Sequence, residues 1–207
     1  CISGCMRLDK DQSYTRKMRR LLSMYSLSYY RSLLNGYLKG QKDNKVKIIL
    51  KFLGDVNGLT ILDVGCGSGF ISAELCKRGA KVFSGDFSRN VLSFIPRQNL
   101  AGFAIFDAQH LPFKTSSFDA IVATDVLEHL LSPRSFLNEA YRCLKSRGYL
   151  VISTPNLWYK KIMHMIRCLV TLIKNPNRFK NSTTKEEWGS LHIREFSPRE
   201  FIDMLTN

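Results

Sequence analysis

The stretch Thr60-Ile-Leu-Asp-Val-Gly-Cys-Gly-Ser-Gly-Phe70 decides the fold that we predict for this chain of 207 residues. Residues 61–64 are apolar apart from one acid and predict a short buried strand, and residues 70–78 predict the helix that follows it. Three glycines join the two: Gly65, Gly67 and Gly69. Because glycine has no Cβ atom, a ligand can lie against the main chain of this loop, at the N-terminus of the helix.

The spacing of the loop residues indicates the kind of ligand. A dinucleotide-binding fingerprint would have its third glycine at position 70, where this chain has Phe70. Asp63 precedes the first glycine by two residues, and a carboxylate there suits a ligand that carries an ammonium group. We therefore predict a cofactor loop for a ligand other than a dinucleotide.

Two further predicted strands end at an acid. Residues 81–86 end at Asp86, and residues 103–106 are followed by Asp107. Each acid on its own could close a turn or cap a helix. A shared binding site is favoured because the carboxyl ends of parallel strands lie at one edge of the sheet, where open α/β sheets bind their ligands.

The order of the predicted elements indicates the fold class. Strands are also predicted at residues 118–123 and 148–155, and helical segments alternate with the strands along the chain. The chain is therefore predicted to be one α/β domain with a Rossmann-like, doubly wound and mostly parallel sheet.

Residues 45–156 resemble the class I S-adenosylmethionine-dependent methyltransferases, and they are most similar to the ubiquinone/menaquinone-type small-molecule branch; residues 192–201 carry a weaker similarity. The resemblance implies that Asp86 holds both ribose hydroxyls and that Asp107 and the amide of Ala108 contact the adenine edge. The complete set of implied S-adenosylmethionine-binding residues is Asp63, Gly65, Cys66, Gly67, Gly69, Asp86, Phe87, Asp107, Ala108, Thr124 and Asp125.

The same resemblance implies methyl transfer to an oxygen, nitrogen or carbon nucleophile, with O-methylation of a small-molecule or lipid-linked acceptor preferred. His129 is the candidate catalytic base or acceptor-positioning residue, and His192 is a second candidate for the acceptor site. Two alternatives stay open: a nucleic-acid (RNA) methyltransferase, and a truncated cofactor-binding domain without catalytic activity.

The segment Asp125-Val-Leu-Glu128-His129 has two interpretations. Its three polar residues would share one helical face, and in some relatives a Glu-x-x-Glu-His version of the segment supports a divalent metal, for which His192 could be a fourth ligand. The same residues also fit a capping box, in which Glu128 turns back to Asp125. No metal is favoured, and the role of His129 as base or positioning residue is preferred.

Basic residues lie mainly outside the predicted core. The net charge is +14; residues 1–50 carry eleven Lys and Arg against three acids, residues 157–195 carry eight against three, and residues 51–156 carry eleven against nine. These flanking segments could contact an acidic acceptor, an anionic membrane surface or, less favoured, nucleic acid, or they could simply be solvated. Oligomeric state is left open.

Four segments are predicted along the chain: a basic N-terminal helical cap (1–44), the cofactor-binding core (45–156), a basic amphipathic lid (157–196) and the start of the last helix (197–207). Residues 157–174 predict an amphipathic helix that either packs on the core or lies at a membrane interface. The class I fold normally ends in a hairpin of two more strands, so we expect a truncated chain.

Six cysteines without a disulfide-like pattern, and the lack of a predicted membrane span, favour a cytoplasmic protein that could associate peripherally with a membrane.

Overall fold

The computed structural model describes residues 43–93, 100–155 and 194–206 of the chain. In chain order its elements are α3 (Asp43–Leu53), β1 (Thr60–Val64), α4 (Phe70–Cys76), β2 (Lys81–Asp86), η1 (Arg89–Ser93), β3 (Gly102–Ile105), β4 (Phe118–Thr124), η2 (Leu127–His129), α5 (Pro133–Cys143), β5 (Leu144–Ser153) and α7 (Pro198–Thr206). The short elements η1 and η2 are 3-10 helices.

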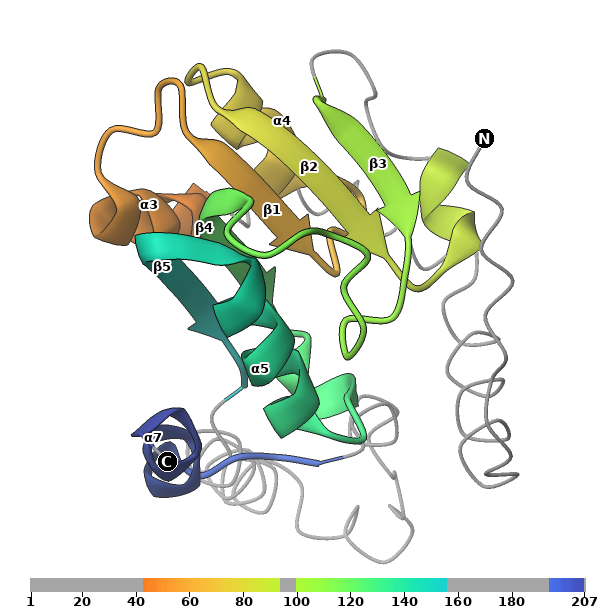
Figure 1. The fold of residues 1–207 in the computed structure, drawn as a ribbon, viewed down its shortest axis with the longest axis vertical. Helices are drawn as coiled ribbons and strands as arrows, with labels where there is room; N and C mark the ends of the chain where they lie inside the picture. The colour runs from red at the N-terminus through yellow and green to blue at the C-terminus, as the bar shows by residue number, and fades with distance from the viewer. Residues whose placement is uncertain (1–42, 94–99, 156–193, 207) are drawn as a thin grey trace, which may run out of the picture.

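The strands form one sheet in the order β3-β2-β1-β4-β5 (Figure 1). All four neighbouring pairs are parallel. Successive strands move outward from β1 in one direction as far as β3, and then β4 and β5 are added on the other side of β1. The order therefore reverses between β1 and β4, and ligands of such sheets bind at the carboxyl edge beside this reversal. The prediction of a doubly wound α/β fold is confirmed.

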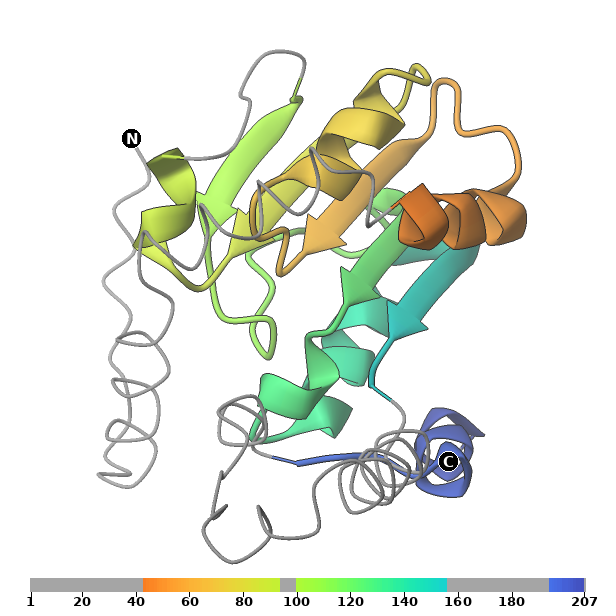
Figure 2. The same ribbon diagram turned by 180° about the vertical axis from the view of Figure 1, so that it is seen from behind.

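Alternate residues of the central strands face two separate cores. On β4, Ile121 and Ala123 pack with α5, whereas Ala120 and Val122 pack on the other face with α3 and α4. Figure 2 shows α3 and α4 together on the face opposite α5. Strands buried on both faces read as continuous apolar runs, which explains why residues 118–123 predict a strand without alternation.

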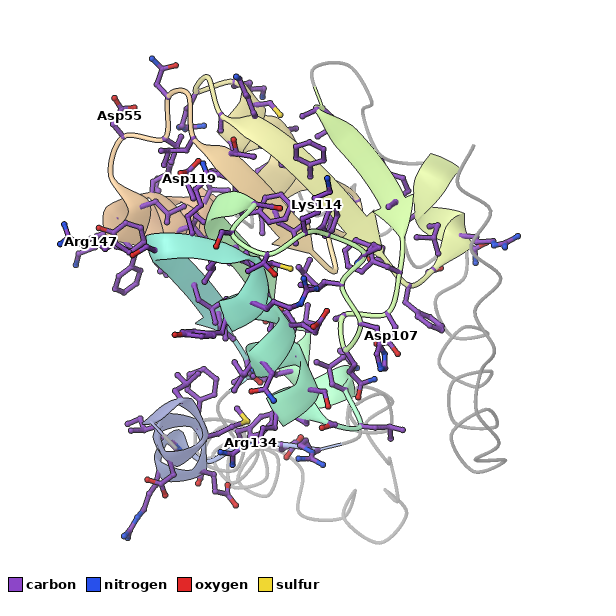
Figure 3. The ribbon with its side chains drawn as sticks, in the orientation of Figure 1. Asp55, Asp107, Lys114, Asp119, Arg134 and Arg147 are labelled. Carbon is purple, nitrogen blue, oxygen red and sulfur yellow. The ribbon has the colours of Figure 1, made fainter. Side chains whose placement is uncertain are left out.

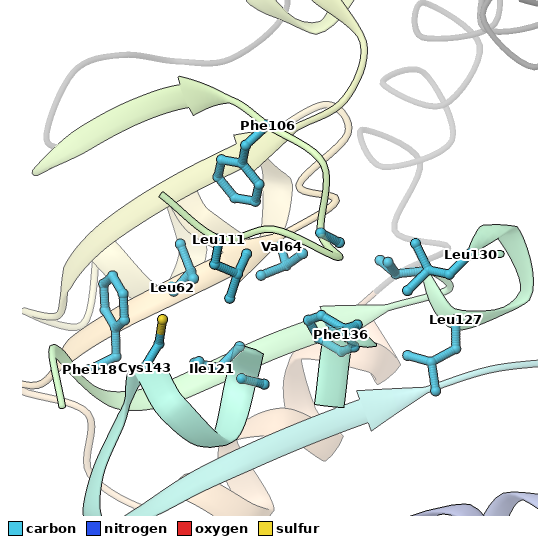
Figure 4. Packing of buried hydrophobic residues seen from close by; sticks show 14 of the residues in the cluster. Leu62, Val64, Phe106, Leu111, Phe118, Ile121, Leu127, Leu130, Phe136 and Cys143 are labelled. Carbon is cyan, nitrogen blue, oxygen red and sulfur yellow. The ribbon is translucent and has the colours of Figure 1, made fainter. Parts of the chain in front are cut away.

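The core on the α5 side is rich in aromatic rings. Phe118 and Phe113 meet edge-to-face with ring centroids 5.0 Å apart, and Phe136 of α5 is fully buried in the same cluster (Figure 4). Phe196 is also buried there, so the segment that leads into α7 belongs to the same core. This packing places the N-terminus of α5 near the carboxyl edge of the sheet.

Two element boundaries differ from the prediction. β5 begins at Leu144 instead of 148, directly after α5, and an irregularity in its pairing with β4 lies between Phe118 and Ala120. Arg147 adopts a left-handed φ of 62° within this irregular part, a local feature that breaks the strand pattern in the sequence. The helix predicted for residues 70–78 ends at Cys76.

The predicted start of the last helix is confirmed. The Ser197 amide donates to Glu200 Oε2 at 2.8 Å and the Glu200 amide donates to Ser197 Oγ at 3.3 Å, which is the reciprocal pattern of a capping box. The described residues include almost none of the predicted N-terminal cap and lid. His192 also lies outside them. Within the described ranges, no helix is long and apolar enough to cross a membrane.

Candidate functional site

The glycine loop between β1 and α4 is held in a left-handed conformation. Gly65, Gly67 and Gly69 have φ values of 65°, 53° and 72°. The amide of Cys66 donates to the carbonyl of Gly85 at 3.1 Å, which fastens the loop to β2, and the Cys66 side chain is buried. Left-handed angles strain residues that have a Cβ atom, so this path of the main chain favours glycine at all three positions.

The glycines at 65 and 67 serve different spatial needs. A Cβ atom at Gly65 would lie 2.5 Å from Cγ2 of Val126, so this glycine allows the β4 turn to pack against the loop. Among the described residues other than its two chain neighbours, no atom would lie within 4 Å of a Cβ atom at Gly67. The surface at Gly67 is therefore open, and a ligand can approach the main chain there.

Asp86 joins the end of β2 to this loop. Its Oδ2 accepts a hydrogen bond from the Gly67 amide at 3.1 Å, and its Oδ1 accepts one from the Ser88 amide at 2.8 Å. Burial raises the pKa of Asp86, and the Ser88 and Gly67 amides lower it in part. The next residue, Phe87, is half-buried. The predicted ribose-binding carboxylate thus lies beside the open face of the loop.

Asp63 lies below the loop. Only 1% of the residue is exposed, and its Oδ2 accepts a hydrogen bond from Ser72 Oγ of α4. Ser72 Oγ is also 2.7 Å from Ser84 Oγ of β2. Burial raises the pKa of Asp63 to about 7, although the Ser72 hydroxyl lowers it in part. The second oxygen, Oδ1, has no hydrogen-bond partner within the described part of the chain.

Asp107, after β3, is held by a residue that we did not predict from the sequence. The side-chain amide of Gln109 donates to both carboxylate oxygens of Asp107 at 3.1 Å, and the Gln109 main-chain amide donates to Oδ1 at 2.9 Å. Oε1 of Gln109 accepts from the Ser132 amide at 2.8 Å. Ala108 between them is buried. Figure 3 shows Asp107 far from Asp55 and Asp119, which lie toward the amino end of the sheet.

The residues after β4 do not form the helix that we predicted. Thr124 ends the strand half-buried, and Asp125 has a left-handed φ of 55°, so only the three-residue 3-10 helix η2 follows. The Asp125 amide donates to the Ser153 carbonyl at 2.9 Å, and the Asp125 carboxylate forms an ion pair with Lys45 of α3. The prediction that Asp125 and Glu128 share a helical face is therefore wrong, because pairing with β5 directs the backbone at Asp125.

The capping-box interpretation of Asp125 and Glu128 is wrong as well. Glu128 is 1% exposed, and its Oε2 accepts a hydrogen bond from Thr154 Oγ1 at 3.1 Å. Its Oε1 has no hydrogen-bond partner in residues 43–93, 100–155 and 194–206. Burial raises the pKa of Glu128 to about 7; the nearby Asp125 charge raises it further, while Thr154 and Lys45 lower it. His129, next in sequence, is half-buried.

Residues 62–152 match the model of a family described as "Methyltransferase domain". This range contains the glycine loop, all the strand-end acids and His129. Residues 62–152 are therefore similar to a methyltransferase domain.

Named relatives and a solved structure are also similar to this chain. A demethylmenaquinone methyltransferase from Clavibacter sepedonicus is 42% identical over 108 residues, which are 48% of this chain and 44% of the relative. A ubiquinone biosynthesis O-methyltransferase from Hydrogenovibrio crunogenus is 30% identical over 129 residues, covering 59% and 54%. The chain thus spans about half the length of these curated relatives. The crystal structure of a SAM-dependent methyltransferase from Aquifex aeolicus has a TM-score of 0.52 and 25% identity, covering 61% of this chain and 71% of that chain.

The open side of the glycine loop fits a polar cofactor such as S-adenosylmethionine. The main chain at Gly67 is unobstructed. Asp63 Oδ1 and Ser68 Oγ, at either end of the loop, are buried without a hydrogen-bond partner among the described residues. Buried polar atoms normally find partners, so unsatisfied atoms on both sides of an open loop indicate that a polar ligand or ordered water completes the site.

The four-residue metal set of Asp125, Glu128, His129 and His192 is only partly described. Among residues 43–93, 100–155 and 194–206, no group of three His, Cys, Asp or Glu residues could hold a metal ion. His192 lies outside these ranges.

The segment before α7 touches the η2 turn, a contact that we did not predict from the sequence. The Arg194 amide donates to the Glu128 carbonyl at 3.2 Å, and Arg194 Nη2 donates to the Leu131 carbonyl at 3.2 Å. These bonds join residues more than sixty positions apart. The chain beyond β5 therefore returns to the turn that carries His129.

Proposed function

We propose that this chain is an S-adenosylmethionine-dependent methyltransferase whose acceptor is a small molecule with a reactive hydroxyl group. The observation that carries the proposal is the open, left-handed main chain at Gly67, held by Asp86 at the carboxyl edge of a parallel sheet. The names of the two relatives support a quinone-precursor class of acceptor.

In this proposal the strand-end residues bind and orient the cofactor, which supplies a methyl group already activated on a sulfonium. Asp86 would accept hydrogen bonds from the ribose hydroxyls, and Asp107 with the Ala108 amide would contact the adenine edge. The loop amides and Asp63 would be near the amino-acid end, where the carboxylate of Asp63 attracts an ammonium. Thr124 and Asp125 would border the site after β4.

On the acceptor side, His129 would accept the proton of the hydroxyl group as it attacks the methyl carbon in line with the departing sulfur. The half-buried position of His129 beside the buried Glu128 supports this role, because a base must be accessible to the acceptor yet shielded from bulk water. Positioning of donor and acceptor supplies much of the acceleration. His192 stays a proposed contributor to the acceptor site.

Cofactor binding can be tested with a pair of matched glycine substitutions. Gly67 and Gly58 both have left-handed φ values, 53° and 77°, and a Cβ atom at either would have open space around it. Gly58 lies before β1, at the amino end of the sheet. We expect Gly67→Arg to abolish S-adenosylhomocysteine binding in calorimetry and Gly58→Arg to retain it, since both share the backbone strain but only one blocks the loop. Equal binding by the two variants would contradict the location of the site.

Methyl transfer can be tested with labelled S-adenosylmethionine and three acceptor classes: quinone precursors with free hydroxyls, lipid-linked sugars and RNA. We expect transfer to a quinone precursor, and a loss of roughly 10²- to 10⁴-fold in kcat for His129→Ala with cofactor affinity unchanged. Transfer to RNA alone would reject the small-molecule acceptor. Full activity of His129→Ala would reject its role as the base. Loss of activity with a chelator, and its recovery with Mg²⁺, would favour the metal alternative.

A further inference from the structure

Gln109 makes a set of hydrogen bonds that leaves one orientation for its side chain. Its residue is 7% exposed, and its amide nitrogen lies 3.1 Å from both carboxylate oxygens of Asp107. Its Oε1 lies 2.8 Å from the main-chain nitrogen of Ser132. A carboxylate only accepts hydrogen bonds and a main-chain N–H only donates, so a flipped amide would be mismatched at both ends.

This arrangement restricts the carboxylate of Asp107. The Gln109 amide group bridges both oxygens, and its main-chain amide adds a third hydrogen bond at Oδ1. Ser132, at the other end of Gln109, is the N-cap of α5, so the amide is anchored to a helix rather than to a loop. Gln109 and, through it, α5 therefore restrain the plane of the Asp107 carboxylate. His110 Nδ1 also lies near this carboxylate, 4.0 Å from Oδ2.

We propose that Gln109 is a positioning residue that makes the cofactor site selective for a purine with a 6-amino group, by holding the carboxylate of Asp107 where it accepts a hydrogen bond from that group. This inference rests on the proposed function, in which Asp107 contacts the adenine edge. A fixed carboxylate discriminates strongly because it forms a hydrogen bond with a donor and cannot rotate to avoid an acceptor.

The test measures a ratio of two affinities by calorimetry on the full chain. The ligands are S-adenosylhomocysteine and its 6-deamino analogue, in which purine replaces adenine. The unsubstituted protein is expected to bind S-adenosylhomocysteine about 10- to 100-fold more tightly, the range for a hydrogen bond to a charged group. Gln109→Met is expected to reduce this preference below about threefold while binding the 6-deamino analogue within about twofold of the unsubstituted protein.

Two more variants separate positioning from folding. Gln109→Glu keeps an acceptor for the Ser132 amide but removes the donor to Asp107 and adds a like charge, so it should also lose the preference. In an Asp107→Asn background, Gln109→Met should cause no further loss of preference, because the two residues act as one unit.

The possible results distinguish the inference from the proposed function. If the unsubstituted protein binds neither ligand, the proposed function fails and the inference fails with it. If it binds both equally well, the cofactor site stands but Asp107 does not select the amino group, and the inference fails. If Gln109→Met and Gln109→Glu weaken both ligands by the same factor, Gln109 only supports the fold of the loop, and the positioning role is overturned.

Discussion

Glu128 and Asp63 are buried carboxyl groups whose pKa values are both raised to about 7 by burial. Each has one oxygen that accepts a hydrogen bond from a hydroxyl group and one oxygen without a partner among the residues that the structure describes. A buried carboxyl group in this state costs stability when it ionises, and such groups often occur at binding or catalytic sites. Asp63 lies below the glycine loop of the proposed cofactor site, and Glu128 precedes His129, the proposed base.

The raised pKa of Glu128 predicts a pH dependence of stability. Its folded pKa of about 7 is above the ordinary pKa of 4.5 for a glutamate, so the folded protein keeps a proton that the unfolded chain releases between about pH 4.5 and 7. The free energy of unfolding should therefore fall as the pH rises through this window, by at most about 3 kcal/mol from Glu128. We expect Glu128→Gln to unfold at higher urea than the unsubstituted protein at pH 8 and at similar urea at pH 5.

The matched control is Glu139→Gln. Glu139 is partly exposed and pairs with Arg142. The hydrogen bond with Arg142 is the main cause that lowers the pKa of Glu139, so the contribution of Glu139 to stability changes only below pH 4.5. The Glu139→Gln variant and the unsubstituted protein should therefore show the same change in the free energy of unfolding between pH 5 and 8. Asp63, whose pKa is also raised to about 7, should lower the free energy of unfolding further over the same pH range. An unchanged slope in Glu128→Gln would show that Glu128 is ionised in the folded protein at pH 5.

At the scale of elements, the N-terminus of α5 connects the two halves of the site. Ser132 caps the helix, Pro133 follows at its first position, and the Ser132 amide is bonded to Gln109. The η2 turn with His129 immediately precedes this cap. One helix start therefore borders both the proposed adenine end and the proposed acceptor end.

Loss of this cap should be measurable by urea unfolding. Ser132 Oγ accepts a hydrogen bond from the Ser135 amide at 3.3 Å, and Ser132→Ala removes it. We expect the free energy of unfolding to fall by about 1 kcal/mol, the usual effect of losing a serine cap. Ser132→Asp keeps a hydrogen-bond acceptor at the cap, so it should retain most of the free energy of unfolding that Ser132→Ala loses. No difference between the two variants would mean that the cap contributes little.

At the scale of the whole molecule, basic charge is concentrated outside the core. Nineteen of the 31 Lys and Arg residues lie in residues 1–50 and 157–195, whereas residues 51–156 carry eleven bases and nine acids. Most of those flanking residues lie outside the described ranges. Their charge can still be tested, because long-range electrostatic attraction depends on ionic strength more than on geometry.

We expect the full chain to sediment with anionic liposomes at low salt and to be released as the salt concentration is raised. It should not sediment with neutral liposomes. An RNA shift assay under the same salt series distinguishes a nucleic-acid partner from a membrane surface. A version shortened to residues 43–207 should bind more weakly in proportion to the basic residues removed. Absence of binding to liposomes and RNA at low salt would indicate that the basic segments are simply solvated.

The sequence alone was enough to predict the strand, glycine loop and helix at residues 60–78, the parallel α/β fold and the acids at the strand ends. Local sequence patterns predict these features: apolar runs, glycines at left-handed positions and capping residues such as Ser197. Each depends on neighbours within a few positions, so it can be read without knowing the tertiary contacts.

Only the tertiary structure decided how the site is assembled from distant parts of the chain. Lys45 pairs with Asp125 across eighty positions, and Arg194 reaches the carbonyl of Glu128 across sixty-six. Gln109 bridges Asp107 and Ser132, and β5 turns the backbone at Asp125 out of the predicted helix. No local pattern encodes these partners, because packing of the sheet against its helices determines which polar groups are buried together and which pKa values rise.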